Sequence, residues 1–253
     1  LNKMSAKSGV KALVSHRSDD GGLLFRWVAW LTGSKNALKG LAFFLGGALL
    51  QWAGFQTAIA ILMGLIAVAL IGAGLGLTAD IGKANTKPKF KDLWSRSTKV
   101  NQLSLARLFL FASRDVWFVV SLPVVLTSVF GWQHSEIGGY FALWIMGYGV
   151  IQGLAPWITQ GKQRVIGAGD VILWSIPLIV VVALLAIQWQ WGGASQSILL
   201  WGLALYAGLF AVISSLHSAL ILYWSRADGV SLDVGFYYMS NAAGRLLGTL
   251  LSG

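Results

Sequence analysis

Residues 55–77 read FQTAIAILMGLIAVALIGAGLGL, a run of apolar and small residues that contains no charge. A helix needs about 20 mostly apolar residues to cross the roughly 30 Å of hydrocarbon in a bilayer. Since this run is long enough, it predicts a membrane-spanning helix, and it sets the expectation for the rest of the chain.

Six further segments have the same character, and the first residues look like the last turns of an eighth helix. The six segments are 27–51, 102–127, 137–159, 168–188, 197–224 and 233–253, and the partial helix is 1–14. Composition agrees, because only 11% of the 253 residues are charged, against about 25% in a soluble globule. The sequence predicts an all-α, polytopic transmembrane bundle. Because it starts and stops inside such patterns, we expect an internal fragment of a longer protein.

The connections between these segments alternate in charge. Those at 15–26, 78–101, 160–167 and 225–232 carry Lys or Arg, and those at 52–54, 128–136 and 189–196 carry neither. Membrane proteins keep their basic loops on the cytoplasmic side. The four basic connections are therefore predicted to be cytoplasmic, and the alternation supports the number of spans.

Several classes of protein are disfavoured by the composition. The net charge is +10, but the cations are divided between loops and helix interiors and form no single basic face for nucleic acid. The chain has no cysteine, 3 histidines and 9 acids, so we expect no metal and no cofactor. We find no HExxH motif, no paired aspartates and no Ser–His–Asp set, and we expect no enzyme activity.

Cations inside the predicted spans are the most informative residues. A Lys or Arg at a helix centre costs about 2.5–3.5 kcal/mol, so it faces a polar interior and suggests a functional site. Lys35 and Lys39 lie four residues apart on one helix face, with Asn36 beside them. Lys3 and Lys7 have the same spacing. We predict that these residues bind an anionic substrate; acids elsewhere are the structural alternative.

Two other predicted helices carry deep charges. Arg114 and Asp115 lie near the middle of the span 102–127, where neighbouring side chains point about 100° apart and need not pair. Asn241 and Arg245 are four residues apart in the last span. Arg114, Asn241 and Arg245 are predicted substrate ligands. Asp115 is either a proton-coupling site or a counter-ion, and Arg107 is interpreted as reaching the cytoplasmic edge.

Weaker polar features are interpreted as packing. His217 is expected to be a hydrogen-bonded core histidine. Tyr140, Trp144, Tyr148 and Gln152 form a stripe at helical spacing, which is typical of packing, with a pore-lining wall as the alternative. Altogether the deep cations outnumber the one deep acid, which predicts an electropositive cavity and a multiply charged anion as substrate.

The number of helices suggests a domain organisation. Residues 1–77 would end an N-terminal helical bundle, 78–101 would be a basic cytoplasmic linker, and 102–253 would form a C-terminal bundle without its last helix. This matches helices 4 to 11 of a major facilitator, a fold of two six-helix halves around a central cavity.

Particular stretches bring a closer resemblance. They are LNKMSAKS (1–8), LTGSKNALKG (31–40), KPKF (87–90), ARLFLF (106–111), RDVWFV (114–119) and DVGFYYM (233–239). Together they resemble the organoarsenical efflux permease family ArsJ over essentially the whole chain. The resemblance implies a multi-pass protein of the bacterial inner membrane that exports 1-arseno-3-phosphoglycerate and confers arsenate resistance. It also implies a functional link to a glyceraldehyde-3-phosphate dehydrogenase, which makes that substrate.

Two alternatives remain at this point. The chain could be a major facilitator for another organic anion, such as a sugar phosphate or a drug-like acid. A membrane enzyme acting on lipid phosphates is the alternative from another class, and the missing catalytic motifs disfavour it.

Overall fold

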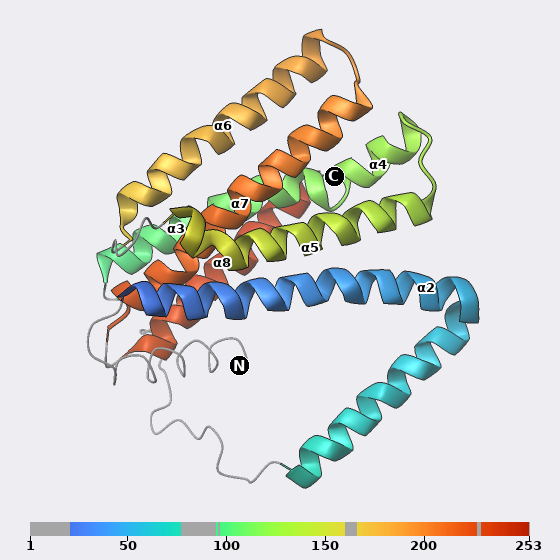
Figure 1. The fold of residues 1–253 in the computed structure, drawn as a ribbon, viewed down its shortest axis with the longest axis horizontal. Helices are drawn as coiled ribbons and strands as arrows, with labels where there is room; N and C mark the ends of the chain where they lie inside the picture. The colour runs from blue at the N-terminus through green and yellow to red at the C-terminus, as the bar shows by residue number, and fades with distance from the viewer. Residues whose placement is uncertain (1–20, 77–94, 96, 160–165, 227–228, 253) are drawn as a thin grey trace.

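The helices of this protein are seen in a computed structural model (Figure 1). It describes residues 21–76, 95, 97–159, 166–226 and 229–252. The helices are α2 (Gly21–Gly76), α3 (Thr98–Phe118), α4 (Ser121–Ser128), α5 (His134–Thr159), α6 (Ala168–Trp191), α7 (Gln196–Trp224) and α8 (Val230–Ser252). This described part has no strand, so the all-α prediction is confirmed.

Five helical segments in the described residues are long and apolar enough to cross a membrane. They are Trp52–Gly76, Thr98–Ser128, Ser135–Thr159, Ala168–Trp191 and Gln196–Trp224. The first part of α2 and the whole of α8 are helical as predicted but lie outside this set. Both carry predicted site residues, and these polar side chains lower their mean hydropathy. The chain therefore has the architecture of a helical membrane protein.

α2 contains two of the predicted spans, joined by a kink at Gly54. This residue has φ 74° and ψ 168°, in the left-handed region that glycine enters without a Cβ clash. The first part of α2 lies along α5, whereas the part after the kink swings away from the bundle (Figure 1). The predicted connection at 52–54 is thus a sharp bend within one continuous run of helix.

The predicted span 102–127 is interrupted, because α3 ends at Phe118 and α4 begins at Ser121. Pro123 explains the break. Proline has no N–H to donate to the carbonyl four residues earlier, that of Val119, and its ring clashes with that carbonyl. α3 begins where Ser97 caps it, since the Ser97 hydroxyl oxygen accepts from the Val100 amide at 3.4 Å.

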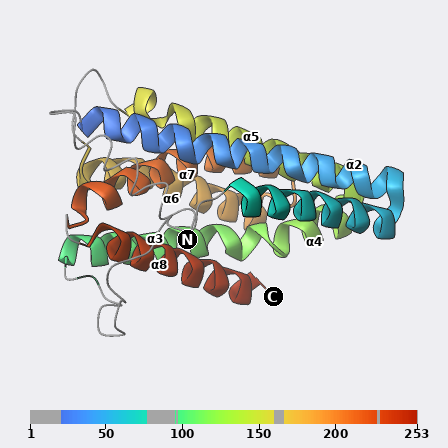
Figure 2. The same ribbon diagram turned by 90° about the horizontal axis from the view of Figure 1, so that it is seen from below.

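Small residues set the closest helix contacts. In Figure 2, α2 lies beside α5 and α3 beside α8, with α7 between the two pairs. A Cβ at Gly33 of α2 would lie 2.5 Å from the carbonyl oxygen of Gly149 in α5, and one at Gly248 of α8 would lie 2.6 Å from that of Ala112 in α3. Glycine lets helices approach closely where lipid removes the hydrophobic drive to pack.

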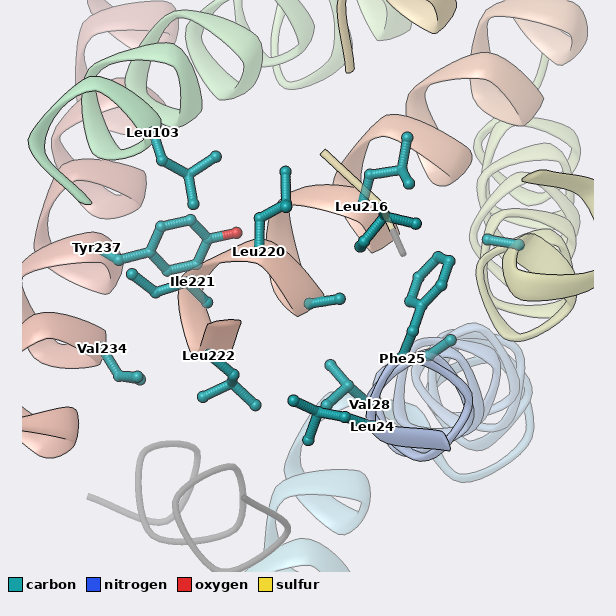
Figure 3. Close-up of a cluster of buried hydrophobic side chains, with 14 of the residues drawn as sticks. Leu24, Phe25, Val28, Leu103, Leu216, Leu220, Ile221, Leu222, Val234 and Tyr237 are labelled. Carbon is teal, nitrogen blue, oxygen red and sulfur yellow. The ribbon is translucent and has the colours of Figure 1, made fainter. Parts of the chain in front are cut away.

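α7 is the central helix, and its residues from 209 to 222 are all buried. Near its C-terminal end, an apolar cluster joins it to the start of α2 and to α3 and α8 (Figure 3). In that view Phe25 and Val28 of α2 lie near Leu216 and Leu220 of α7. This cluster closes the bundle at the end where α7 finishes and α8 begins.

A hydrogen-bonded carboxylate ties the helix ends together beside this cluster. Asp233, in the first turn of α8, accepts from the Ser95 hydroxyl at 2.6 Å and from the Arg226 amide at 3.0 Å. Its side chain is 1% exposed and also pairs with the Arg226 guanidinium at 3.5 Å. The entry to α3, the exit of α7 and the start of α8 are therefore held at one point.

Candidate functional site

The site is built on the antiparallel contact between α3 and α7. Arg107 of α3 meets Ser214 of α7, and one turn further along α3 the Phe111 ring packs edge-on against Phe210, with ring centroids 5.2 Å apart. Residue numbers therefore rise along α3 as they fall along α7, so the two helices are antiparallel. This arrangement places a polar stripe of α3 against the serine-containing middle of α7.

Arg107 is the buried cation at the centre of this contact, with only 5% of its surface exposed. Its Nη1 donates to the Ser214 carbonyl at 3.2 Å and to the Ser214 hydroxyl at 2.9 Å, and its Nε donates to Asn241 Oδ1 at 3.2 Å. The prediction that Arg107 reaches the membrane edge is wrong. It lies nine residues into α3, about 14 Å along the axis, and Ser214 and Asn241 offer acceptors inside the bundle.

The hydrogen bonds continue from Ser214 toward α2. Tyr148 donates to the Ser214 hydroxyl oxygen at 3.0 Å, and Gln152 Nε2 donates to it at 3.2 Å. Asn36 Nδ2 then donates to Gln152 Oε1 at 2.6 Å. We call this set the amide–arginine network, and its members are Asn36, Arg107, Tyr148, Gln152, Ser214 and Asn241.

The network brings two predicted site residues into one connected set. Asn36 of α2 and Asn241 of α8 are linked through Gln152, Ser214 and Arg107. Five helices, α2, α3, α5, α7 and α8, thus contribute to one polar region. Buried polar groups that satisfy one another in this way fix a specific helix arrangement.

A second group lies further along α3, and we call it the arginine–aspartate cluster: Arg114, Asp115 and Arg245. Arg114 donates to Asp115 Oδ1 from Nε at 2.6 Å and from Nη2 at 2.5 Å, and Arg245 Nε donates to Oδ2 at 2.9 Å. Helix geometry left open whether Arg114 and Asp115 pair, and the structure shows that they do. The guanidinium is long enough to fold back to the adjacent carboxylate, which is 1% exposed.

Aromatic rings connect the two groups. The Arg107 and Arg114 guanidinium carbons lie 4.1 Å and 4.7 Å from the centroid of the same ring, Phe111. Arg107 also lies 5.1 Å from the Tyr237 ring. Ring faces carry negative charge that attracts cations, so they help hold the Arg107 and Arg114 guanidiniums inside the bundle. Charge balance within the two groups is positive.

The other predicted ligands lie in different structural environments. Lys35 and Lys39 lie at exposed positions of α2, on the same turns as Asn36, which turns toward α5. Arg245 has a side chain that is 57% exposed even though its Nε contacts Asp115. Lys3 and Lys7 lie outside the described residues. The structure thus places Asn36, Arg114, Asp115, Asn241 and Arg245 in the two defined groups.

The aromatic stripe of α5 divides into two parts. Trp144 packs, because its Nε1 donates to the Leu203 carbonyl at 3.0 Å and its ring stacks on Tyr148 at 5.9 Å. Tyr148 and Gln152 belong to the amide–arginine network. His217 is buried as expected, but neither of its ring nitrogens has a hydrogen-bond partner among the described residues. The core position predicted for His217 is confirmed, whereas its expected hydrogen bond is not found among the described residues.

Four residues of the site are not among the predicted ligands: Arg107, Tyr148, Gln152 and Ser214. A signal for Arg107 was present, since it lies seven residues before Arg114 with Phe111 between them, on one helix face. Within the described ranges, no three side chains of His, Cys, Asp or Glu come together as metal ligands. The guanidinium and amide groups of the site are suited to binding negative charge.

Fold and site together define a polytopic helical membrane protein with an electropositive polar region inside the bundle. Compared with protein-family models, curated proteins and solved structures, the chain finds no match.

Proposed function

We propose that this chain belongs to a secondary transporter of the major facilitator type that exports a small, multiply charged organic anion. The observation behind this proposal is the charge balance of the site: Arg107, Arg114 and Arg245 bring three positive charges, whereas Asp115, which pairs with Arg114 and Arg245, brings one negative charge. Buried cations need a compensating anion. A substrate anion supplies that charge when it is bound.

Guanidinium groups suit this task particularly well. Their planar donors bind carboxylate and phosphate in a two-point geometry, and they stay charged when buried. Arg107 has only neutral hydrogen-bond partners among the described residues, namely Ser214 and Asn241. A bound anionic group would therefore gain a charge-assisted contact without breaking an existing ion pair.

The placement of the network supports transport. It connects α2, which precedes the 78–101 connection, with α3, α5, α7 and α8, which follow it. In a major facilitator, two bundles rock around a site at their interface. The proposed division is 1–77, 78–101 and 102–253, with the basic connections cytoplasmic and the protein in the bacterial inner membrane. The apolar cluster of Figure 3 then closes the cytoplasmic end.

The particular substrate follows from resemblance, whereas electrostatics gives its sign. The ArsJ-like stretches favour 1-arseno-3-phosphoglycerate, made by a partner glyceraldehyde-3-phosphate dehydrogenase. Its several negative charges suit a site with surplus guanidiniums. The alternative is a major facilitator for another organic anion, such as a sugar phosphate or a drug-like acid.

The test uses arsenic-sensitive bacteria that express the protein with or without a glyceraldehyde-3-phosphate dehydrogenase. We expect arsenate resistance only when both are present, and we expect Arg107→Gln to remove it. Lys99→Gln is the matched control, because Lys99 lies at an exposed position at the start of α3. Resistance that needs neither the dehydrogenase nor Arg107 would contradict the proposal. Inhibition of anion efflux by unmodified sugar phosphates would favour the alternative substrate class.

A further inference from the structure

His217 is a buried polar side chain that the proposed site does not yet use. It lies in the middle of α7 with 1% of its surface exposed, and both ring nitrogens lack a partner in the described part of the chain. A buried polar group without a hydrogen bond destabilises the folded protein. In either protonation state the imidazole has at least one N–H donor. His217 can therefore donate a hydrogen bond to an acceptor that binds beside it.

The α3–α7 register places a second unpartnered group at the same level along the helix pair as this histidine. Arg107 meets Ser214 and Phe111 meets Phe210, so each step back along α3 is one step forward along α7. Three residues before Arg107 is Ser104, and three residues after Ser214 is His217. Ser104 is fully buried, and its hydroxyl also has no partner among the described residues. Two buried polar groups at the same level of α3 and α7 are therefore both without a hydrogen-bond partner among the described residues.

Arg107 provides the charge beside them. Its Nε and Nη1 are used by Asn241 and Ser214, while Nη2 has no acceptor among the described side chains and backbone groups. Donors from one guanidinium, one hydroxyl and one imidazole thus lie within one helical turn of each other, about 5 Å along each helix.

We propose that Ser104, Arg107 and His217 form a subsite that binds one oxyanion group of the substrate, either a carboxylate or a phosphate-like group. The inference rests on the proposed function, because it assigns part of the same site. Arg107 Nη2 donates to the anionic oxygens, and the Ser104 hydroxyl and one His217 N–H donate to the same group. A bound water would satisfy the hydroxyl and the imidazole, but it would bring no negative charge to the guanidinium.

The surroundings strengthen such binding. Leu103, Leu216 and Leu220, which flank Ser104 and His217 in the sequence, belong to the apolar cluster that closes the bundle (Figure 3). This cluster keeps water away from one side of the subsite. Hydrogen bonds to a charged group are stronger where water is excluded, so a small number of donors can hold one oxyanion.

The test is calorimetric titration of the purified protein with inorganic phosphate and, separately, with acetate. His217→Phe keeps a ring of related shape but removes both nitrogens, and we expect it to weaken binding about tenfold, as a lost charged hydrogen bond does. His217→Gln restores an N–H donor and is expected to recover most of the affinity. Ser175→Ala is the control, because this α6 hydroxyl bonds only to the Val171 carbonyl of its own helix.

A double-mutant cycle sharpens the result. Because Arg107 and His217 hold the same group, the variant with both Arg107→Gln and His217→Phe should bind little worse than Arg107→Gln alone. A loss with phosphate only would assign a phosphate-like group, and a loss with acetate only would assign a carboxylate. Unchanged affinity for both probes in His217→Phe, or equal losses in His217→Gln and His217→Phe, would overturn the subsite. Since the measurement needs no transport, intact binding in a protein that moves no anion would contradict the proposed function alone.

Discussion

Two apolar helical segments of this protein have opposite surroundings. The part of α2 after Gly54 is exposed along nearly its whole length, with Ala58 as its one buried residue, whereas α7 is buried continuously from 209 to 222. Both are long and apolar enough to cross a membrane. The buried helix carries Ser214, Ser215, His217 and Ser218 in its middle, and the exposed segment is uncharged.

The comparison shows what hydropathy does and does not indicate in a membrane protein. Apolar length identifies a span, because lipid solvates apolar side chains as well as a protein core does. Polar side chains identify the interior, because only protein groups can satisfy them there. The helix with the lower apolar content is therefore the one at the centre.

The largest expected effect is on the polar centre. Arg107→Gln removes the guanidinium that donates to Ser214 and Asn241, and we expect anion transport to fall by about 100-fold or more, since lost charge-assisted contacts are worth roughly 1.5–3 kcal/mol each. The measurement is the initial rate of anion uptake into inverted membrane vesicles. A transport rate within a few-fold of that of the Lys99→Gln control would show that the contact between Arg107 and α7 contributes to packing and not to anion transport.

Asp115→Asn is expected to have the next largest effect, on stability. It leaves Arg114 and Arg245 without their carboxylate, and breaking a buried pair from one side costs about 3–5 kcal/mol. Thermal unfolding of the purified protein should show a lower midpoint. Combining Asp115→Asn with Arg245→Gln should recover part of the loss, since one unpaired cation is removed. An unchanged midpoint in Asp115→Asn would contradict the counter-ion role and favour the alternative, a proton-coupling site.

A matched pair of isoleucines tests the comparison directly. Ile213 of α7 is 1% exposed, and Ile66 of the segment after Gly54 is 68% exposed. Ile213→Ala should lower the free energy of unfolding by about 2–5 kcal/mol because it leaves a cavity. Ile66→Ala should change it by about 0.5 kcal/mol or less. Chemical denaturation in detergent measures both, and equal losses would mean that the segment after Gly54 is packed as tightly as α7.

The smallest effect is expected from a glycine pair on α5. A side chain at Gly149 would overlap the backbone at Ala37 and Gly33 of α2, whereas a Cβ at Gly138 meets nothing within 4 Å. Gly149→Leu should destabilise the protein by about 1–3 kcal/mol through overpacking. Gly138→Leu serves as the control in the same unfolding assay. Similar midpoints for the two variants would show that α2 does not press on α5 at this point.

The fold was predictable where local composition decides it. α5, α6 and α7 lie within a few residues of the predicted spans. The break between α3 and α4 was missed, because a proline in an apolar run has no fixed outcome. Pro156 and Pro177 lie inside continuous helices, while Pro123 follows a break. Neighbouring helices decide whether the freed carbonyl is satisfied, and a single sequence does not specify those neighbours.

The site was predictable only in part, for a related reason. Periodicity predicts interior positions for Asn36, Asn241 and Arg245. The position of a residue along its own helix does not, however, identify the residue of a neighbouring helix that it contacts. The sequence alone favours an edge position for Arg107, whereas the structure places the Ser214 hydroxyl within hydrogen-bond distance of it. Arg114 and Asp115 pair because the guanidinium folds back, which the 100° separation of neighbouring side chains did not suggest.

The glycine contact between α2 and α5 has a mechanical consequence. In most helix pairs, ridges of side chains on one helix pack into grooves on the other. Gly33 and Gly149 bring the two backbones together with no side-chain ridge between them. In this contact the backbones touch directly, without interlocking side chains. The Asn36–Gln152 hydrogen bond crosses the same interface, so at this level a polar contact, rather than interlocking side chains, specifies how α2 and α5 are rotated relative to each other.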